Sequence, residues 1–444
     1  MSNDVLPLPA AWVHENPTMS TIDDLLRHIA LPRMVRVRQL FADDALADVA
    51  AALREEMRAT PIAALVKPGA RIAVAVGSRG LADLPLVVNV VVDELKQRGA
   101  RPFIVPAMGS HGGATAEGQT ALLAALGVTE ASAGCPIVSS MATVELGRLR
   151  SGLPVYMDEQ AMQADGIVVV NRVKPHTSFS GPSESGLVKM LSIGLGKQKG
   201  AESCHALGFA QMAQYIVEMA RVKLQHAPIL FGVATVENAY EKISRVAAVP
   251  ASDIIARDAE LLQEAKHNMP CILFNPLDVL VVDRMGKEYS GTGMDPHITG
   301  RTSTPYVETR QQVTRMVVLD LSDKSKGNAT GMGLADICSR RLVAKVDYDA
   351  TYANHLTSTV VWHAKVPMTL PSDQRAIQAA VKTCNVPELA RLRMVRIPNT
   401  LHLEHVEISE PMLDEAARHA QIEVLGEPRP WPFDADGNLT DLGH

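Results

Sequence analysis

The sequence has few cysteines, and they follow no recognisable spacing. Its 444 residues contain five cysteines, an odd number, scattered along the chain without any C-x-x-C pair. Disulfide frameworks and thiolate zinc sites both depend on paired, closely spaced cysteines. The sequence therefore predicts free thiols and argues against a fold held together by disulfides.

Apolar runs, basic runs and aromatic residues are also scarce. No apolar stretch approaches the roughly 18 residues that a membrane-spanning helix needs, and the first residues, MSNDVLPLPAAWVHENP, lack the basic and apolar regions of a secretory signal. With 4% aromatic residues and a formal charge of −6, the chain offers little to grip a phosphate backbone or stack on bases. We therefore expect a cytoplasmic protein that binds neither membranes nor nucleic acid.

What the sequence does contain is a regular alternation of strand and helix patterns. Apolar, β-branched runs at 71–76, 101–106 and 167–170 predict strands, and periodic stretches at 86–99 and 116–126 predict helices between them. Such alternation is typical of a mostly parallel or mixed sheet with helices on both faces. The predicted fold class is α/β.

The length predicts two domains, because one hydrophobic core rarely extends over so many residues. The alternation restarts with a strand pattern at 279–283. We therefore expect an N-terminal α/β domain, 1–270, and a C-terminal α/β domain, 271–444, that ends in an extended strap. Gly-rich loops of both parts then face each other, and we expect the active site in the cleft between them.

Two further expectations concern single elements. Residues 33–40 alternate like a half-exposed strand, which we place at the edge of the first domain. Residues 334–342 have a helical pattern, which we place in the second domain.

Three loops that follow strands carry most of the reactive side chains. They are GSRGLADLP (77–85), AMGSHGGAT (107–115) and NRVKPHTSFSG (171–181). Because the carboxyl ends of parallel strands meet at one edge of a sheet, these loops are expected to converge on a ligand.

His111, His176 and Arg79 are the residues of these loops best suited to act on a substrate. Imidazoles titrate near neutral pH and can exchange protons with a substrate, and a guanidinium suits a carboxylate. Taken singly, each of them fits an ordinary polar loop residue or a member of a surface ion pair equally well. Their convergence on one sheet edge favours a site.

Lys189 lies among apolar residues in GLVKML, where an ammonium is costly to bury unless it is paired, deprotonated or covalently used. A surface lysine that extends its head to water is the alternative. On reactivity alone, Lys174, Lys197 and Lys199 are open candidates too. His205 follows in ESCHALGF, where a helix-capping role is the alternative to a functional one.

Taken together, VGSRGLADLP, MGSHGGATAEG, His176, Lys189 and His205 resemble the nickel-dependent lactate racemase family. Lys189 and His205 are sixteen residues apart, which matches the family's separation between its cofactor-bearing lysine and its nickel-ligating histidine. The resemblance extends over most of the chain, and an ordered set of five matches is more specific than any one of them.

The resemblance implies a nickel-pincer nucleotide, that is, a pyridinium-3-thioamide-5-thiocarboxylic acid mononucleotide that carries nickel. Lys189 would hold it through the thioamide and His205 would be a nickel ligand, which agrees with the affinity of imidazole for nickel. Ser78, Gly109 and Ser110, from the first two loops, would contact the cofactor.

The activity implied by the resemblance is racemisation or epimerisation at C2 of a 2-hydroxy acid, by abstraction and return of a hydride. His111 and His176 would exchange the hydroxyl proton on opposite faces, while Arg79 and Lys287 would bind the carboxylate. Polar residues in the Gly-rich loops of the second part predict a substrate larger and more polar than lactate, such as a sugar acid.

Two other functions fit the same residues. His111, His176 and His205 can be read as a three-histidine zinc site of a hydrolase or lyase. The chain can also be read as a sugar-acid-binding protein without catalysis. A nicotinamide dehydrogenase is disfavoured, because no G-x-G-x-x-G follows a strand with an acidic residue about 20 positions later.

Overall fold

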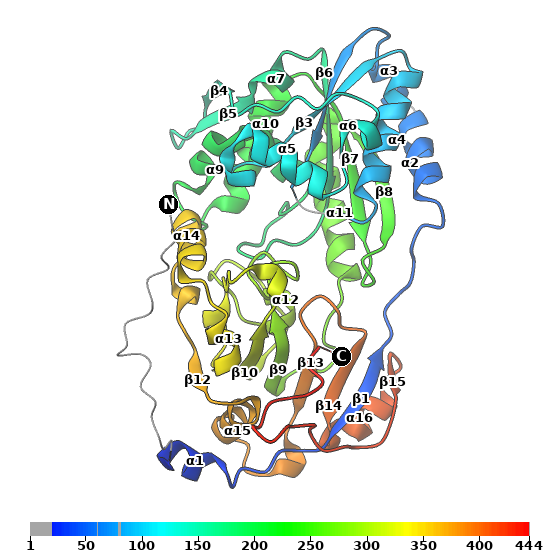
Figure 1. The fold of residues 1–444 in the computed structure, drawn as a ribbon. Coiled ribbons are helices and arrows are strands. Elements are labelled where there is room, and N and C mark those ends of the chain that lie inside the picture. Colours follow the sequence, from blue (N-terminus) through cyan, green and yellow to red (C-terminus); the bar gives the residue numbers. More distant parts are fainter. Residues whose placement is uncertain (1–19, 60, 79–80, 444) are drawn as a thin grey trace.

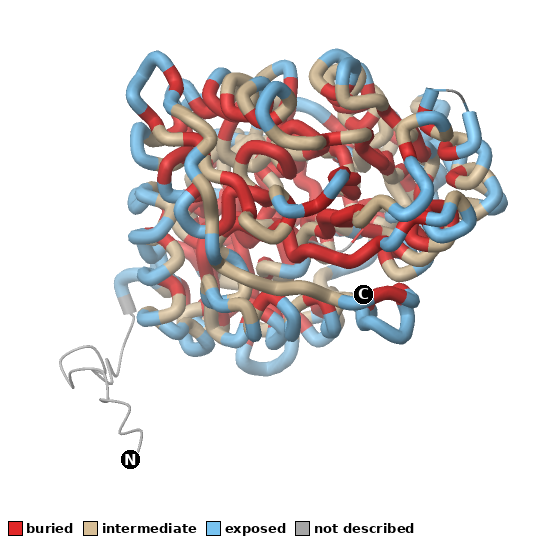
Figure 2. The backbone as a smooth tube through the Cα atoms, turned by 90° about the horizontal axis from the view of Figure 1, so that it is seen from above, coloured by how far each residue is buried: buried red, intermediate tan, exposed pale blue. Residues whose placement is uncertain are grey.

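The computed structural model describes residues 20–59, 61–78 and 81–443, which are arranged in two halves (Figure 1). We call the part built on a five-stranded sheet the first half and the part built on an eight-stranded sheet the second half. Buried residues run through the middle of the molecule and exposed ones lie on its outer loops (Figure 2). Arg79, predicted to bind a carboxylate, lies outside the described residues.

The sheet of the first half is mostly parallel, as predicted. Its order is β3-β2-β6-β7-β8, with only β8 antiparallel to its neighbour. Its strands are β2 (Arg71–Val76), β3 (Arg101–Pro106), β6 (Gly166–Arg172), β7 (Ile229–Glu237) and β8 (Ile243–Pro250). The sequence analysis did not anticipate β8.

Residues 72–76 of β2 and 167–170 of β6 are all apolar, and both faces of the sheet are accordingly covered. Successive residues alternate between two cores, with Ala73 and Val169 in one and Val74 and Val168 in the other. The covering helices are α2 (Val49–Arg58), α4 (Leu84–Gln97), α5 (Ala116–Ala125), α8 (Leu187–Ser192), α9 (Lys197–His205), α10 (Met212–His226) and α11 (Ile254–Asn268). A separate antiparallel hairpin joins β4 (Thr143–Arg148) and β5 (Pro154–Asp158).

The sheet of the second half is mixed and has the order β12-β11-β10-β9-β13-β14-β1-β15. Its strands are β9 (Leu277–Met285), β10 (Val313–Leu321), β11 (Ile337–Ser339), β12 (Met368–Leu370), β13 (Met394–Ile397), β14 (His405–Ser409), β1 (Met34–Gln39) and β15 (Ile422–Val424). The α/β fold class predicted from the sequence is therefore confirmed in both halves.

The remaining helices are short or lie at the periphery. They are α1 (Ser20–Leu26), α3 (Ile62–Leu65), α6 (Glu130–Ala133), α7 (Glu159–Met162), α12 (Pro296–Thr299), α13 (Arg340–Ala344), α14 (Tyr348–Ser358), α15 (Asp373–Thr383) and α16 (Leu413–Arg418). Between residues 20 and 443, no described helix has the length and apolar character to cross a bilayer. All five cysteines are free, as predicted.

The structure corrects two of the expected elements. The predicted strand at 33–40 does not join the first half, because β1 pairs antiparallel with β14 and with β15 in the second sheet. The predicted helix at 334–342 is instead β11 followed by α13, because Ile337 and Cys338 pair with β10 and are buried there. Pairing within a sheet has overridden the local helical pattern. The domain boundary near residue 270 stays a prediction.

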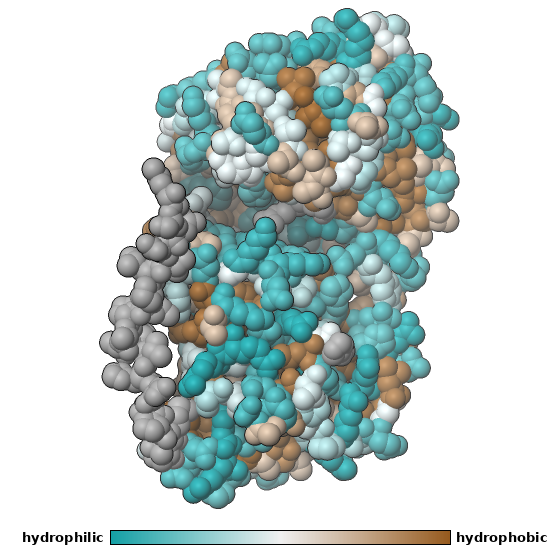
Figure 3. Space-filling view, in the orientation of Figure 1, coloured by the Kyte–Doolittle hydropathy of each residue, from teal (hydrophilic) through white to brown (hydrophobic). Residues whose placement is uncertain are grey.

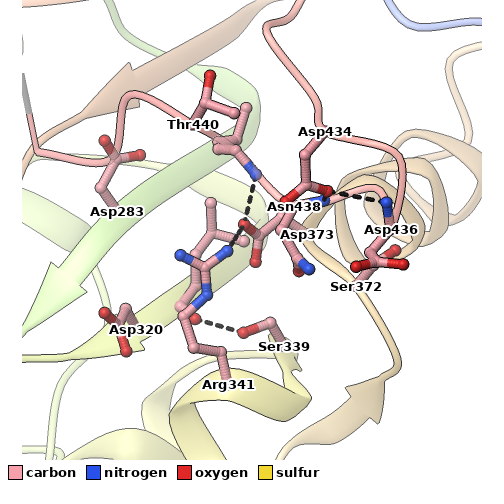
Figure 4. Close-up of polar contacts among 12 residues, drawn as sticks. Asp283, Asp320, Ser339, Arg341, Ser372, Asp373, Asp434, Asp436, Asn438 and Thr440 are labelled. Carbon is pink, nitrogen blue, oxygen red and sulfur yellow. Dashed lines mark hydrogen bonds and ion pairs between the residues drawn. The ribbon is translucent and has the colours of Figure 1, made fainter.

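The end of the chain is tied to the second half by buried carboxylates (Figure 4). Asp373 forms an ion pair with Arg341 and accepts a hydrogen bond of 2.9 Å from the backbone N–H of Leu439. Asp283 accepts one of 2.8 Å from the N–H of Gly443 and also binds Arg396. These bonds fasten the extended C-terminal segment to the second half.

Candidate functional site

One cavity of about 290 Å³ is lined by residues of both halves, and the molecule narrows where the halves meet (Figure 3). The first half contributes the loops after β2, β3 and β6 together with α8 and α9. The second half contributes the end of α14, the 3₁₀ helix η7 (Trp362–Ala364) and two loops. The cavity brings together these residues named in the sequence analysis: Ser78, Gly109, Ser110, His111, His176, Lys189 and His205.

The lining of this cavity is basic. It includes Arg172, Lys174 and Lys189 as well as four histidines, and none of its described residues is an aspartate or glutamate. A cavity with cationic groups and no carboxylate raises the local concentration of anions. The charge alone therefore favours a carboxylate or phosphate ligand.

His111 is placed by a turn that only glycine can form. Gly112 has φ of +68°, and a Cβ atom there would lie 2.7 Å from the backbone N of Gln119. The Gln119 side chain donates to the carbonyls of Gly109, at 3.0 Å, and His111, at 3.2 Å. The His111 Nδ1 atom contacts the hydroxyl of Ser78, so the first two loops meet at this histidine.

His176 is held in one tautomer and from several sides. Its Nδ1 accepts a hydrogen bond of 3.0 Å from the N–H of Ser178, so the neutral ring carries its proton on Nε2. The ring stacks on Phe179 with the centroids 4.4 Å apart. The backbone N–H of His176 donates to the buried Glu184 at 2.7 Å. These contacts fix the ring at the wall of the cavity.

Helix α8, which carries Lys189, is fixed at both ends by buried charges of the favourable sign. At its start, Asp258 accepts a hydrogen bond of 2.6 Å from the N–H of Leu187. At its end, the fully buried Lys223 donates to the carbonyls of Leu191, at 2.6 Å, and Ser192, at 3.0 Å. Helix dipoles favour an anion at the start and a cation at the end. Burial raises the pKa of Asp258 to about 6 and lowers that of Lys223 to about 7.

His205 ends α9 and lines the cavity with a neutral ring. Burial, followed by the charge of Lys189, lowers its pKa to about 4. Its Nδ1 is buried and has no hydrogen-bond partner among the described residues. Such an atom needs an explanation, because nearly all buried polar atoms in proteins are paired. An unprotonated imidazole with an unused nitrogen is a suitable metal ligand.

The three other candidate lysines, Lys174, Lys197 and Lys199, differ in whether they line the cavity. Lys197 is buried in an ion pair of 2.9 Å with Asp158 and supports the His111 loop through Gln119, whereas Lys199 is exposed beside Tyr156. Neither lines the cavity, but Lys174 does.

Lys287 does not line the cavity but contacts two residues that do. Its ammonium donates to the carbonyl of Gly291 and to Oδ1 of Asn354, both at 2.7 Å, and those two residues line the cavity. Lys287 therefore reaches the cavity only through the lining residues that it contacts.

The sequence analysis missed several residues of the site. Asn354 and His363 line the cavity, and Lys223 and Asp258 hold α8. All four lie on helices and not in loops at strand ends, so the rule that ligands bind at strand ends did not apply. A weak signal was the pair of histidines, His355 and His363, flanking an apolar segment.

The zinc alternative lacks its ligand cluster. Although His111, His176 and His205 share the cavity, no three histidine, cysteine, aspartate or glutamate side chains come together as a metal-binding group in the described parts of the chain. A three-histidine zinc site needs all three nitrogens within about 2.1 Å of one point.

One model of a known family matches the larger part of the first half. Residues 31–215 match the model of the lactate racemase N-terminal domain. Over these residues the chain is similar to that domain. The matched range includes His111, His176, Lys189 and His205.

Two solved structures match the chain at low sequence identity. A lactate racemase apoprotein from Thermoanaerobacterium thermosaccharolyticum is 13% identical with a TM-score of 0.46, and the match covers 79% of this chain and 85% of that one. A protein from Thermotoga maritima is 14% identical with a TM-score of 0.46, covering 74% of this chain and 82% of that one. None of the curated proteins matches the chain significantly.

Proposed function

We propose that the chain is a racemase or epimerase that inverts C2 of a 2-hydroxy acid. The observation that carries the proposal is a single basic cavity, free of carboxylates among its described residues, that contains His111, His176, Lys189 and His205. The match of residues 31–215 to the lactate racemase N-terminal domain supports an isomerase.

The residues present fit a nickel-pincer nucleotide. Lys189 lies on a helix fixed at both ends, beside apolar residues that suit a neutral, amide-like linkage. His205 offers an unprotonated ring whose buried Nδ1 lacks a partner among the described residues. When bound, the cofactor would supply the hydride acceptor, and the chain would supply its attachment and one nickel ligand.

The other residues would bind the substrate and move one proton. His111 and His176 line the cavity from the separate loops after β3 and β6, so one can take the hydroxyl proton and the other return it to the opposite face. Arg79 is proposed to bind the carboxylate, and Lys287 is proposed to orient the amide of Asn354. Asn354, Thr292 and Thr330 add polar groups suited to a substrate larger than lactate. A small-molecule substrate and a cytoplasmic location remain predictions.

The first test is the intact mass of protein co-produced with enzymes that make the cofactor. We expect a mass increase for the wild type and for Lys199→Arg, whose lysine is exposed outside the cavity, and none for Lys189→Arg. A mass increase retained in Lys189→Arg would remove Lys189 from this role and direct attention to Lys174.

The second test is racemisation in deuterated water with a panel of 2-hydroxy acids. Hydride return inverts C2 without solvent deuterium, and His111→Asn or His176→Asn should lower the rate by about 100-fold or more. Substantial deuterium at C2 would instead indicate proton abstraction. Tight binding of a sugar acid without any turnover would indicate the non-catalytic alternative.

A further inference from the structure

The cavity has a second wall, supplied by the end of α14 and by η7. Asn354 and Ser358 are one helical turn apart and both line the cavity, whereas Thr351 and His355, also one turn apart, are buried on another face of the helix. His363 follows in η7 and lines the cavity as well. The proposed reaction at C2 uses none of these side chains directly.

The amide of Asn354 is oriented by two donors. Lys287 donates to its Oδ1 at 2.7 Å, and the Nδ2 group of Asn328 does so at 3.4 Å. Since neither donor can bond to an amide N–H₂, the contacted atom must be the oxygen. The N–H₂ group of Asn354, which donates to no described residue, is the part left for the cavity.

His363 is oriented by its neighbour His355. The Nδ1–H of His355 donates to the carbonyl of Val360 at 2.8 Å, which makes its Nε2 an acceptor. The two rings are in edge contact with centroids 4.4 Å apart. His355 Nε2 and His363 Nδ1 are both buried and without a partner among the described residues. In the tautomer of His363 that carries its proton on Nδ1, the Nε2 atom is left as an acceptor.

From this arrangement we infer that Asn354 and His363 bind a hydroxyl group on the tail of the substrate, with the amide donating and the imidazole accepting. A hydroxyl both donates and accepts, so it matches this pair, whereas a methyl group would leave both polar groups unpaired. His355 and Lys287 are positioning residues in this scheme. The inference rests on the proposed function and specifies which kind of tail the enzyme selects.

The environment keeps this pair uncharged. Burial, then the neighbouring His355 and Lys287, lowers the pKa of His363 to about 4. A neutral imidazole and a neutral amide suit an uncharged hydroxyl better than a second carboxylate, which would gain most from a protonated ring. The favoured substrate is therefore a polyhydroxylated monocarboxylic acid rather than a dicarboxylic one.

The experiment compares lactate, gluconate and malate as substrates of cofactor-loaded protein. These acids carry a methyl, a polyhydroxylated and a carboxylate tail. Asn354→Leu and His363→Phe should each lower kcat/KM for gluconate by about 3- to 10-fold, mainly through KM, and change that for lactate by less than 2-fold. Leu356→Ala, at a 73% exposed position of the same helix, should change neither. Retained lactate turnover shows that each variant is folded.

The positioning role of His355 has its own readout. His355→Phe should raise KM for gluconate without changing kcat, and combined with His363→Phe it should add nothing further. Equal losses on gluconate and lactate, or a loss confined to malate, would overturn the inference while leaving the proposed function intact. If the wild type turns over no acid, the proposed function fails. Calorimetric binding of gluconate against lactate to the same variants then decides the subsite separately.

Discussion

At the scale of single residues, the cavity contains two histidines that the fold keeps uncharged. The pKa values of His205 and His363 are lowered to about 4, in both cases mainly by burial. For each, the unfolded chain binds a proton between about pH 4 and 6.5 and the folded chain does not. Above pH 6.5 both states are neutral and this effect is absent. As the pH falls toward 4, protonation favours the unfolded chain, and the free energy of unfolding decreases.

This difference predicts how stability depends on pH. The free energy of unfolding should fall between pH 7 and pH 5, and His363→Phe should reduce that fall by about 1–2 kcal/mol. Urea unfolding at the two pH values measures it, with the exposed His226→Asn on α10 as the control. An unchanged fall in His363→Phe would mean that His363 is protonated in the folded protein.

At the scale of elements, α8 shows how a short helix with a reactive lysine is kept in place. Six residues form too short a helix to be stable alone. Asp258 comes from α11 and Lys223 from α10, so two neighbouring helices define where α8 begins and ends. The position of Lys189 therefore depends on side chains distant from it in the sequence.

Lys223→Met tests this arrangement. The variant leaves the carbonyls of Leu191 and Ser192 without their donor, and we expect a loss of about 1–3 kcal/mol in the free energy of unfolding. Because burial lowers the pKa of Lys223 to about 7, the folded chain releases its proton before the unfolded chain does. Wild-type stability should therefore rise from pH 7 toward 10, and the variant should lack that rise. Lys199→Met is the control, and equal behaviour of the two variants would contradict this role.

The sequence predicts those features that depend on local hydrophobic patterns. It does not predict those that depend on contacts between residues distant in the chain. The parallel strands β2, β3 and β6 follow from apolar runs, and the loops that place His111 and His176 follow from those strands. His363 could not be found this way, since its place depends on how the second half packs against the first. The same holds for β1, whose alternation predicts a strand but not which sheet it joins.

At the scale of the whole molecule, the loop that carries His176 is held by the second half. Ser180 N–H donates to the carbonyl of Tyr306 at 2.7 Å, and Ser303 Oγ donates to that of Thr177 at 3.3 Å. Trp362, next to His363, donates its indole N–H to the carbonyl of Ser303 at 2.6 Å. These bonds connect the two walls of the cavity through residue 303.

Trp362→Phe should loosen that connection. We expect it to cost about 0.5–1.5 kcal/mol of stability and to speed amide hydrogen exchange in residues 176–180. Trp431→Phe is a matched control, because the Trp431 indole donates to the carbonyl of Pro32 at 3.0 Å, away from the cavity. Unchanged exchange in 176–180, or equal changes in the two variants, would show that Trp362 does not act on this loop.

The place of β1 in the second sheet has a mechanical consequence. The chain leaves that sheet after residue 39, builds the first half, and returns to it at residue 277, so two separate segments cross between the halves. A body attached at two points can swing about the line through them, whereas sliding or twisting strains both attachments. Any opening and closing around a substrate would then be a hinge movement with one axis. Each cycle would return the two walls of the cavity to the same alignment.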